Sequence, residues 1–173
     1  MTDAPKKTAL LSAADITGIV EFAHGLHELG WELVSSGLTA KTLRQAEVPV
    51  REVGELTKAA DLVAGRVRLL QPRLFGGILA DRQDAGQMRE LEREDIPTVD
   101  LVAVNLYPLA QVLESGQMSQ REAMDFLDVS GAALLRAAAR RFHGVIALCD
   151  PKDYPSVLDT LRRGKGLSVD QSR

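Results

Sequence analysis

The segment VDLVAVNLY, residues 99–107, decides the fold class that this sequence indicates. Apolar side chains occur at nearly every position rather than at every second one, which is typical of a strand buried on both faces of a sheet. Further apolar runs of strand length lie at residues 8–12, 31–36 and 144–150, with a shorter one at residues 50–53. The sequence therefore predicts a sheet with both faces covered.

Segments with helical periodicity separate these strands. Residues 17–29, 38–46 and 84–94 carry apolar side chains at helical spacing, and a further helix is predicted for residues 130–141. Ser119 and Glu122 form a capping-box pattern, and Asp150 followed by Pro151 is typical of a helix start. Because strand and helix alternate, we predict an α/β fold of three layers: a parallel sheet with helices on both faces.

Length and composition limit the class of protein. A chain of 173 residues without repeats or low-complexity linkers predicts a single domain over residues 1–173, with a polar tail from about residue 164. A net charge of −3 argues against a nucleic-acid partner, which needs a basic surface. No apolar run reaches the roughly 20 residues of a membrane span, so no membrane partner is expected. The single cysteine, Cys149, is predicted to be a buried apolar residue in a cytoplasmic protein.

The carboxyl ends of parallel strands are where ligands bind in such sheets, because loops and helix N-termini meet there. After the second predicted strand the sequence reads SSGLT, residues 35–39, directly before a predicted helix. The N–H groups and the dipole of a helix N-terminus favour an anion such as phosphate. Serine and threonine are also ordinary helix caps in this position. This stretch alone leaves both interpretations open.

Five stretches together resemble the IMP cyclohydrolase domain of the bifunctional enzyme AICAR transformylase/IMP cyclohydrolase. In chain order these are residues 12–50, GRVRLLQPRLFGGILADR (65–82), DLVAVNLYPL (100–109), DVSGAALLRAAARR (128–141) and LCDPKDY (148–154). The resemblance covers roughly residues 8–163, and the wider superfamily includes methylglyoxal synthase. It implies a methylglyoxal-synthase-like fold in a homodimer that uses no cofactor.

The activity that the resemblance implies is closure of the formamido-imidazole ribotide FAICAR to IMP with loss of water. The partner is thus a small-molecule ribotide. Position by position, the resemblance implies substrate and phosphate binding by Ser12, Ser36, Gly37, Thr39, Arg66, Asn105 and Gly131. It implies catalytic roles for Tyr107, Asp128, Arg68 and Arg140. Without it, Tyr107 is an interfacial tyrosine after a strand and Asp128 a helix cap, and these alternatives stay open.

The chain departs from the family at several of these positions. Ile16 replaces a lysine, and Leu38 replaces a glycine in the family's SGGT. If that glycine needs a positive φ, Leu38 is expected to strain the phosphate site. Gln71 replaces a histidine, which removes a titratable group.

Two family lysines are replaced by Arg68 and Arg140. An arginine keeps the positive charge but does not readily release a proton, because its pKa lies above about 12. Anion binding is therefore expected to survive, while proton transfer falls to Tyr107 and Asp128 or to water. On the predicted helix, Arg140 shares a face with Arg136, four residues away, while Arg141 turns away. This spacing allows both to point into one pocket, and the alternative that Arg136 lies on a solvated or ion-paired basic face stays open.

The segment GRVRLLQPRLFGGIL, residues 65–79, places three arginines before a glycine pair that we expect to be mobile. This combination suits an anionic ligand, with Arg68 at its reacting end and Arg66 on phosphate or a structural carboxylate. Arg73 is expected to be a solvated charge. The three histidines lack a third ligand at metal-site spacing, so no metal is expected.

Three functions remain open from the sequence. The first is a working IMP cyclohydrolase with an altered set of basic residues. The second is a related cyclase for a different ribotide, and the third is a non-catalytic ribotide-binding or regulatory domain. The tail GLSVDQSR resembles the segment that leads into a transformylase domain. Two alternatives therefore stay open: an excised half of a bifunctional enzyme, and a natural stand-alone protein.

Overall fold

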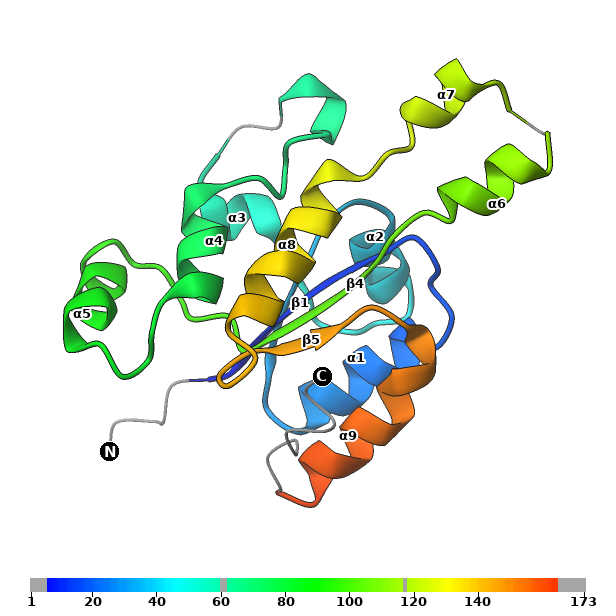
Figure 1. Cartoon of the computed structure of the whole chain (residues 1–173). Helices are drawn as coiled ribbons and strands as arrows, with labels where there is room; N and C mark the ends of the chain where they lie inside the picture. Colours follow the sequence, from blue (N-terminus) through cyan, green and yellow to red (C-terminus); the bar gives the residue numbers. More distant parts are fainter. Residues whose placement is uncertain (1–5, 60–61, 117, 165–173) are drawn as a thin grey trace.

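A parallel five-stranded sheet forms the centre of the molecule (Figure 1). The computed structural model describes residues 6–59, 62–116 and 118–164. The strands of the sheet are β1 (Thr8–Ala13), β2 (Glu32–Ser35), β3 (Arg51–Glu52), β4 (Leu101–Asn105) and β5 (Ile146–Leu148). Their order across the sheet is β3-β2-β1-β4-β5, and every neighbouring pair is parallel. From β1 the chain first builds the sheet outward through β2 and β3, and then adds β4 and β5 on the other side of β1. The carboxyl ends of the strands at such a change of side are the usual ligand site in open α/β sheets.

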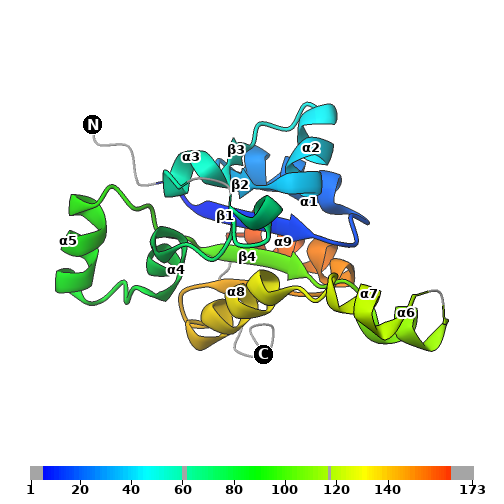
Figure 2. The same cartoon turned by 90° about the horizontal axis from the view of Figure 1, so that it is seen from above.

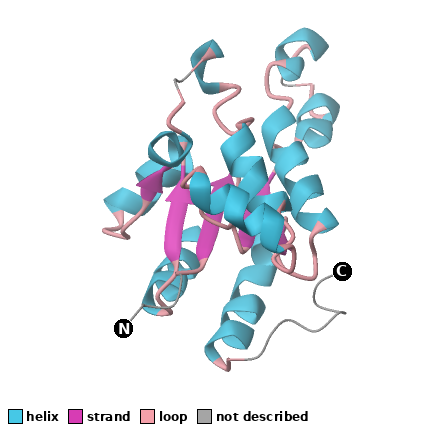
Figure 3. Cartoon of the chain, turned by 90° about the vertical axis from the view of Figure 1, so that its left-hand side faces the viewer, coloured by secondary structure: helices cyan, strands magenta, loops and turns pink. Residues whose placement is uncertain are grey.

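Helices cover both faces of this sheet (Figures 2 and 3). On one face, buried side chains of α1 (Ile19–Glu28), α2 (Gly37–Gln45) and α9 (Tyr154–Arg162) pack against the strands. On the other face, α3 (Val53–Thr57), α4 (Pro72–Leu79) and α8 (Val129–Arg140) do the same. The predicted three-layer α/β fold is therefore confirmed.

The shorter elements extend from the two ends of the sheet. At the amino ends of the strands lies α5 (Ala85–Arg93), and at the carboxyl ends lie α6 (Leu109–Glu114) and α7 (Gln120–Met124) (Figure 1). Two 3₁₀ turns complete the described elements, η1 (Val63–Gly65) and η2 (Pro151–Asp153). Within the described residues no helix is both long and apolar enough to cross a membrane.

Five strands were predicted and five are described, but β2 to β5 are shorter than predicted, whereas β1 is one residue longer. All five residues of β4 are buried, as the continuous apolar run predicted, but Leu106 and Tyr107 leave the sheet before Pro108. At the sheet edge, β3 is only two residues long because Val53 already begins α3. The capping box of Ser119 and Glu122 is present at the start of α7.

The glycine pair of α4 was predicted to be mobile, and this is wrong. Both glycines lie within the helix, and Gly77 is buried. A Cβ atom on Gly77 would collide with the carbonyl oxygen of Pro97 and lie 3.4 Å from Cγ2 of Val99. The backbone N–H of Val99 donates to the Gly77 carbonyl at 3.0 Å. Glycine here allows the chain leading into β4 to pack directly on the helix.

The prediction of a buried Cys149 is also wrong. This thiol is exposed, because the side chain follows the end of the edge strand β5 at a position that no helix covers. The predicted polar tail lies almost entirely in residues 165–173, outside the described residues. The assignment of residues 1–173 to one domain stays a prediction.

Candidate functional site

The N-terminus of α2 faces the carboxyl edge of the sheet. Ser36 is the N-cap, with an extended backbone, and its side chain accepts no capping hydrogen bond. Leu11 of β1 pairs with Ser35 of β2 in the sheet. The residues that follow them, Ser12 and Ser36, therefore lie beside each other. Both side chains point to the face covered by α4 and α8, because residues alternate along a strand and Leu10 and Val34 lie in that core. The two hydroxyl groups thus flank a helix N-terminus that favours an anion.

The positive φ of this turn falls on Gly37, at 60°, and not on Leu38. The expected strain at Leu38 is therefore absent. Its side chain is 61% exposed and points away from the core. Glycine is needed one position earlier than the family comparison of SGGT with SGLT suggested.

Thr39 is fixed by the neighbouring strand. Its Oγ1 accepts a hydrogen bond from the Ala13 N–H at 2.9 Å and donates to the Ala13 carbonyl at 3.2 Å. The residue is only 2% exposed. Its hydroxyl therefore ties α2 to the end of β1, and this bond positions the helix N-terminus beside the site.

Arg68 reaches this helix N-terminus from the loop before α4. Its Nη1 atom lies 3.7 Å from the position that a Cβ on Gly37 would occupy. Together with Lys41, Arg44 and Gln71, it lines a cavity of about 380 Å³ beside α2. The sequence reading missed Lys41 and Arg44, although Lys41 follows Gly37 by four residues and so stands on the same helix face.

The charged side chains that line this cavity are mainly basic among the described residues. Arg44 is paired with Glu52, the acidic side chain of the described lining, at 2.7 Å. Lys41 adds a further basic side chain beside the N-terminus of α2. A basic side chain next to a helix N-terminus suits an anionic group.

The other two arginines of residues 65–79 have structural partners. Arg66 forms an exposed ion pair with Asp125 at 3.4 Å, which matches the carboxylate alternative left open for it. Arg73 was expected to be a solvated charge, and this is wrong. Its guanidinium donates to the carbonyls of Leu56 at 3.3 Å and Asp95 at 2.7 Å, so it connects α4 to helix α3 and to the turn after α5.

Asn105 lies at the carboxyl end of β4, on the face opposite Ser12. Its Oδ1 accepts from the Asp15 N–H at 2.7 Å, and its Nδ2 donates to the Asp15 carbonyl at 2.8 Å. The side chain also hydrogen bonds to Tyr154, whose pKa is raised chiefly by burial. Asn105 is 7% exposed and holds the loop between β1 and α1 in place. The structure thus does not bring its amide together with the serine hydroxyls.

Tyr107 contacts the segment that precedes Asp128. The Tyr107 ring stacks on Phe126, with centroids 5.0 Å apart. Asp128 follows two residues later as the N-cap of α8, where its Oδ1 accepts from the Gly131 N–H at 2.8 Å and from the Ser130 hydroxyl at 3.1 Å. The predicted capping role of Asp128 is confirmed, and its Oδ2 atom has no hydrogen bond within the described residues.

Gly131 supports Asp128 rather than presenting a binding group of its own. A Cβ at this position would collide with Asp128 Oδ2 and would lie 2.8 Å from Cδ2 of Leu106. Glycine therefore permits both the cap and the close packing of α8 on the end of β4.

Arg140 lies at the other end of α8. Asp128 and Arg140 are separated by the whole helix, about 18 Å at 1.5 Å per residue. Arg140 lines a different cavity, at the amino ends of the strands, together with Arg141, while Arg136 is absent from that lining. The expectation that Arg136 and Arg140 share a pocket is therefore wrong. The helix ends at Arg140, so Arg141 does not follow the helical phase.

Comparison with known proteins identifies the family. A family model described as "MGS-like domain" matches residues 18–133. This chain belongs to that family. The methylglyoxal-synthase-like fold predicted from the sequence is thereby confirmed. Among the residues that the structure describes, this MGS-like domain has no group of three or more His, Cys, Asp or Glu side chains arranged to hold a metal ion.

Relatives of this MGS-like domain include bifunctional purine biosynthesis proteins. PurH of Chloroflexus aurantiacus is 45% identical over 156 residues, which are 90% of this chain and 30% of that protein. PurH of Staphylococcus aureus strain Newman is 42% identical over 166 residues, 96% of this chain and 33% of that protein. The chain thus spans about a third of the length of these relatives and is homologous to their MGS-like part.

A solved structure also matches most of the chain. The crystal structure of ForH superposes with a TM-score of 0.80 at 34% sequence identity, and the match covers 96% of this chain and 87% of that chain.

Proposed function

We propose that this chain is an IMP cyclohydrolase, which closes FAICAR to IMP with loss of water. The observation that carries the proposal is the placement of Arg68 at the Gly37 turn, where a cation and a helix N-terminus face the same cavity. The homology to the MGS-like part of PurH supports the same activity. The ribotide's phosphate is proposed to bind at residues 36–39, beside Ser12.

The reaction makes three demands on the site. The carboxamide nitrogen attacks the formyl carbon, so that a C–N bond forms and negative charge collects on the formyl oxygen. That oxygen takes up two protons, which balance the one lost by the attacking nitrogen and the one lost by the formamido nitrogen. The formamido nitrogen forms a C=N bond as the C–O bond breaks, and the oxygen leaves as water. The site must hold the two reacting groups together, stabilise the oxyanion and move protons.

Arg68, Tyr107 and Asp128 are proposed to meet the last two demands. The Arg68 guanidinium stabilises the oxyanion, because its charge persists at every working pH. The Oδ2 atom of Asp128 accepts a proton from the attacking nitrogen, while Oδ1 stays engaged in the cap of α8. Tyr107 donates the proton to the leaving oxygen from its position on Phe126.

The experiment is FAICAR turnover, followed by the absorbance change on IMP formation, for the wild type, Tyr107→Phe and Asp128→Asn. We expect each variant to lower kcat by about 10²-fold or more, the usual effect of losing a general acid or base. Asparagine keeps an oxygen acceptor for the Gly131 N–H, so the cap is retained. Asp159→Asn is the control, because it makes the same chemical change in an exposed pair with Arg163.

Two results would contradict the proposal. One is full turnover in both variants, which would remove Tyr107 and Asp128 from the chemistry. The other is a folded wild type that forms no IMP. If that protein still bound AICAR or IMP, it would be a non-catalytic ribotide-binding domain or a cyclase for another ribotide.

A homodimer is the proposed assembly. Large apolar side chains stand exposed around α6, α7 and the start of α8, namely Leu106, Leu113, Met124, Phe126, Leu127 and Val129. Exposed apolar side chains gathered on one region are typical of a protein interface. A second copy of the chain is the occupant that the family resemblance implies.

We expect Leu127→Glu to convert a wild-type dimer into a monomer, because a carboxylate at a 55% exposed apolar position would be buried without a partner in the interface. Analytical ultracentrifugation at micromolar concentration measures this. Leu29→Glu, at an exposed position after α1, is the control and should remain a dimer. A monomeric wild type at all concentrations would contradict the proposed assembly.

A further inference from the structure

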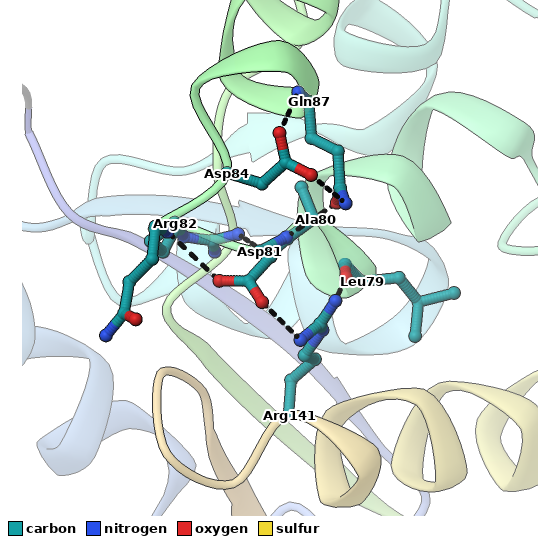
Figure 4. A network of polar contacts seen from close by, with 8 residues as sticks. Leu79, Ala80, Asp81, Arg82, Asp84, Gln87 and Arg141 are labelled. Atoms are coloured by element: carbon teal, nitrogen blue, oxygen red, sulfur yellow. Dashed lines mark hydrogen bonds and ion pairs between the residues drawn. The ribbon is translucent and has the colours of Figure 1, made fainter.

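A second cavity of basic character lies at the amino ends of the strands, at the far end of α8 from the candidate ribotide site. Its volume is about 270 Å³, and its lining combines the loop after α4 with the end of α8, namely residues 80–83, 140–141 and 143–145. Arg82, Arg140, Arg141 and His143 are the basic members, and Asp81 is the only acidic one. Figure 4 shows Asp81, Arg82 and Arg141 converging there from the two elements.

Arg82 is held rigidly at the base of this cavity. Its guanidinium donates to three backbone carbonyls, those of Ala80 at 2.8 Å, Gly77 at 3.1 Å and Val99 at 2.9 Å. Burial lowers the pKa of Arg82 from its ordinary value, and the charge of Asp100 opposes this effect. The Asp100 carboxylate is 3.8 Å away, too far for a hydrogen bond. The positive charge of Arg82 is therefore only partly balanced.

Arg141 is fixed on the opposite wall. Its Nε donates to the Leu79 carbonyl at 2.6 Å, and its Nη1 donates to Oδ2 of Asp81 at 3.2 Å. The other carboxylate oxygen of Asp81 accepts from the Gln83 N–H at 3.0 Å. These hydrogen bonds order the loop after α4. Asp81, the acidic side chain of the lining, neutralises Arg141.

Arg140 completes the cavity without a counter-ion. Its side chain is exposed and makes no hydrogen bond or ion pair within the described residues. Three guanidinium groups, on Arg82, Arg140 and Arg141, are thus matched by two carboxylates, on Asp81 and Asp100. His143 stands at the same rim, with its ring against Phe142 at 3.8 Å.

We propose that this amino-edge cavity binds a phosphate group, as a second anion site separate from the one at α2. Guanidinium groups suit phosphate because their planar N–H donors match its oxygens. The prearranged Arg82 and Arg141 need no reordering to present a positive surface, so only Arg140 loses side-chain freedom on binding. The volume of about 270 Å³ is large enough for phosphate. The site does not depend on the proposed cyclohydrolase activity.

The test is a titration of the ¹⁵N-labelled full chain with inorganic phosphate, followed by amide chemical shifts, against sodium chloride at equal ionic strength. We expect saturable shifts at Gln83 and at residues 141–145. Arg140→Ala should weaken binding about tenfold, as expected for the loss of one charge-assisted contact. Arg89→Ala, which removes an exposed charge from α5, is the matched control and should change the affinity by less than about twofold.

A second titration, with ribose 5-phosphate, distinguishes a phosphomonoester ligand from free phosphate. Tighter binding than inorganic phosphate at the same amides supports a phosphomonoester as the ligand, whereas equal or weaker binding supports the free ion. Three results would overturn the proposal. The shifts could fail to saturate, they could be reduced equally by Arg140→Ala and Arg89→Ala, or they could occur only at residues 36–41.

Discussion

Replacing Arg68 by alanine is expected to lower kcat/KM for FAICAR by about 10²–10³-fold, the usual effect of removing one group that stabilises an oxyanion. The guanidinium lies 3.7 Å from the Cβ position of Gly37 and lines the same cavity as Lys41. Arg68 is half-buried, and water screens a half-buried charge less than a fully exposed one. Steady-state absorbance assays measure the change.

Arg68→Lys and Arg89→Ala sharpen this experiment. Lysine restores the positive charge, and the family has lysine at this position, so we expect Arg68→Lys to keep turnover within about tenfold of the wild type. Arg89→Ala changes the net charge equally on an exposed helix and should leave turnover unchanged. An Arg68→Ala variant that turns FAICAR over at the wild-type rate would remove this residue from the reaction.

The second large effect concerns stability. Gly77→Ala is expected to lower the free energy of unfolding by about 1–3 kcal/mol, the usual cost of inserting a methyl group into a packed core. The new methyl group would meet the Pro97 carbonyl, which belongs to backbone and moves only if the chain entering β4 shifts. Urea unfolding followed by the fluorescence of Trp31, the only tryptophan of the chain, gives the free energy.

Gly76→Ala is the matched control on the same helix. A Cβ there would lie 3.6 Å from Cδ2 of Leu91, an ordinary contact, so alanine is accommodated without movement. Since alanine is the better helix former, we expect the free energy of unfolding to rise by about 0.5–1 kcal/mol. Equal stabilities of the two variants would contradict the close packing that we assign to Gly77.

The fold was predictable because its signals are local and mutually consistent. The continuous apolar run at residues 99–107 and the helical periodicity between runs each pointed to a covered parallel sheet, and β4 is indeed buried throughout. Element ends were less predictable. Val53 begins a helix instead of ending a strand, because tertiary packing of α3 outweighs the strand preference of a β-branched residue.

The site was predictable only in part. The placement of Ser36 and Gly37 at a helix N-terminus follows from sequence order, and Asp128 was recognisable as a cap. The partner of a long side chain depends on tertiary contacts with segments many residues away, as the bonds of Arg73 to Leu56 and Asp95 show. No local pattern contains that information, so Arg73 resembled any exposed arginine.

The separation of Arg140 from Asp128 shows the same limit. Both belong to one motif, DVSGAALLRAAARR, yet the helix that joins them carries Arg140 to the opposite end of the sheet. Adjacency within a motif did not mean adjacency within a site. The lining of the amino-edge cavity, from two segments about 60 residues apart as in the Arg141 to Asp81 bond, was likewise not visible in the sequence.

The central claim is that the carboxyl edge around α2 is the ribotide site. A crystal structure of the chain with bound IMP tests it most directly. We predict that the 5′-phosphate contacts the backbone N–H groups of residues 37–39 and the hydroxyl of Ser36, with the base directed toward Arg68 and Asp128. No density for the nucleotide at residues 36–39 at saturating IMP would contradict the account, whether or not IMP is bound elsewhere.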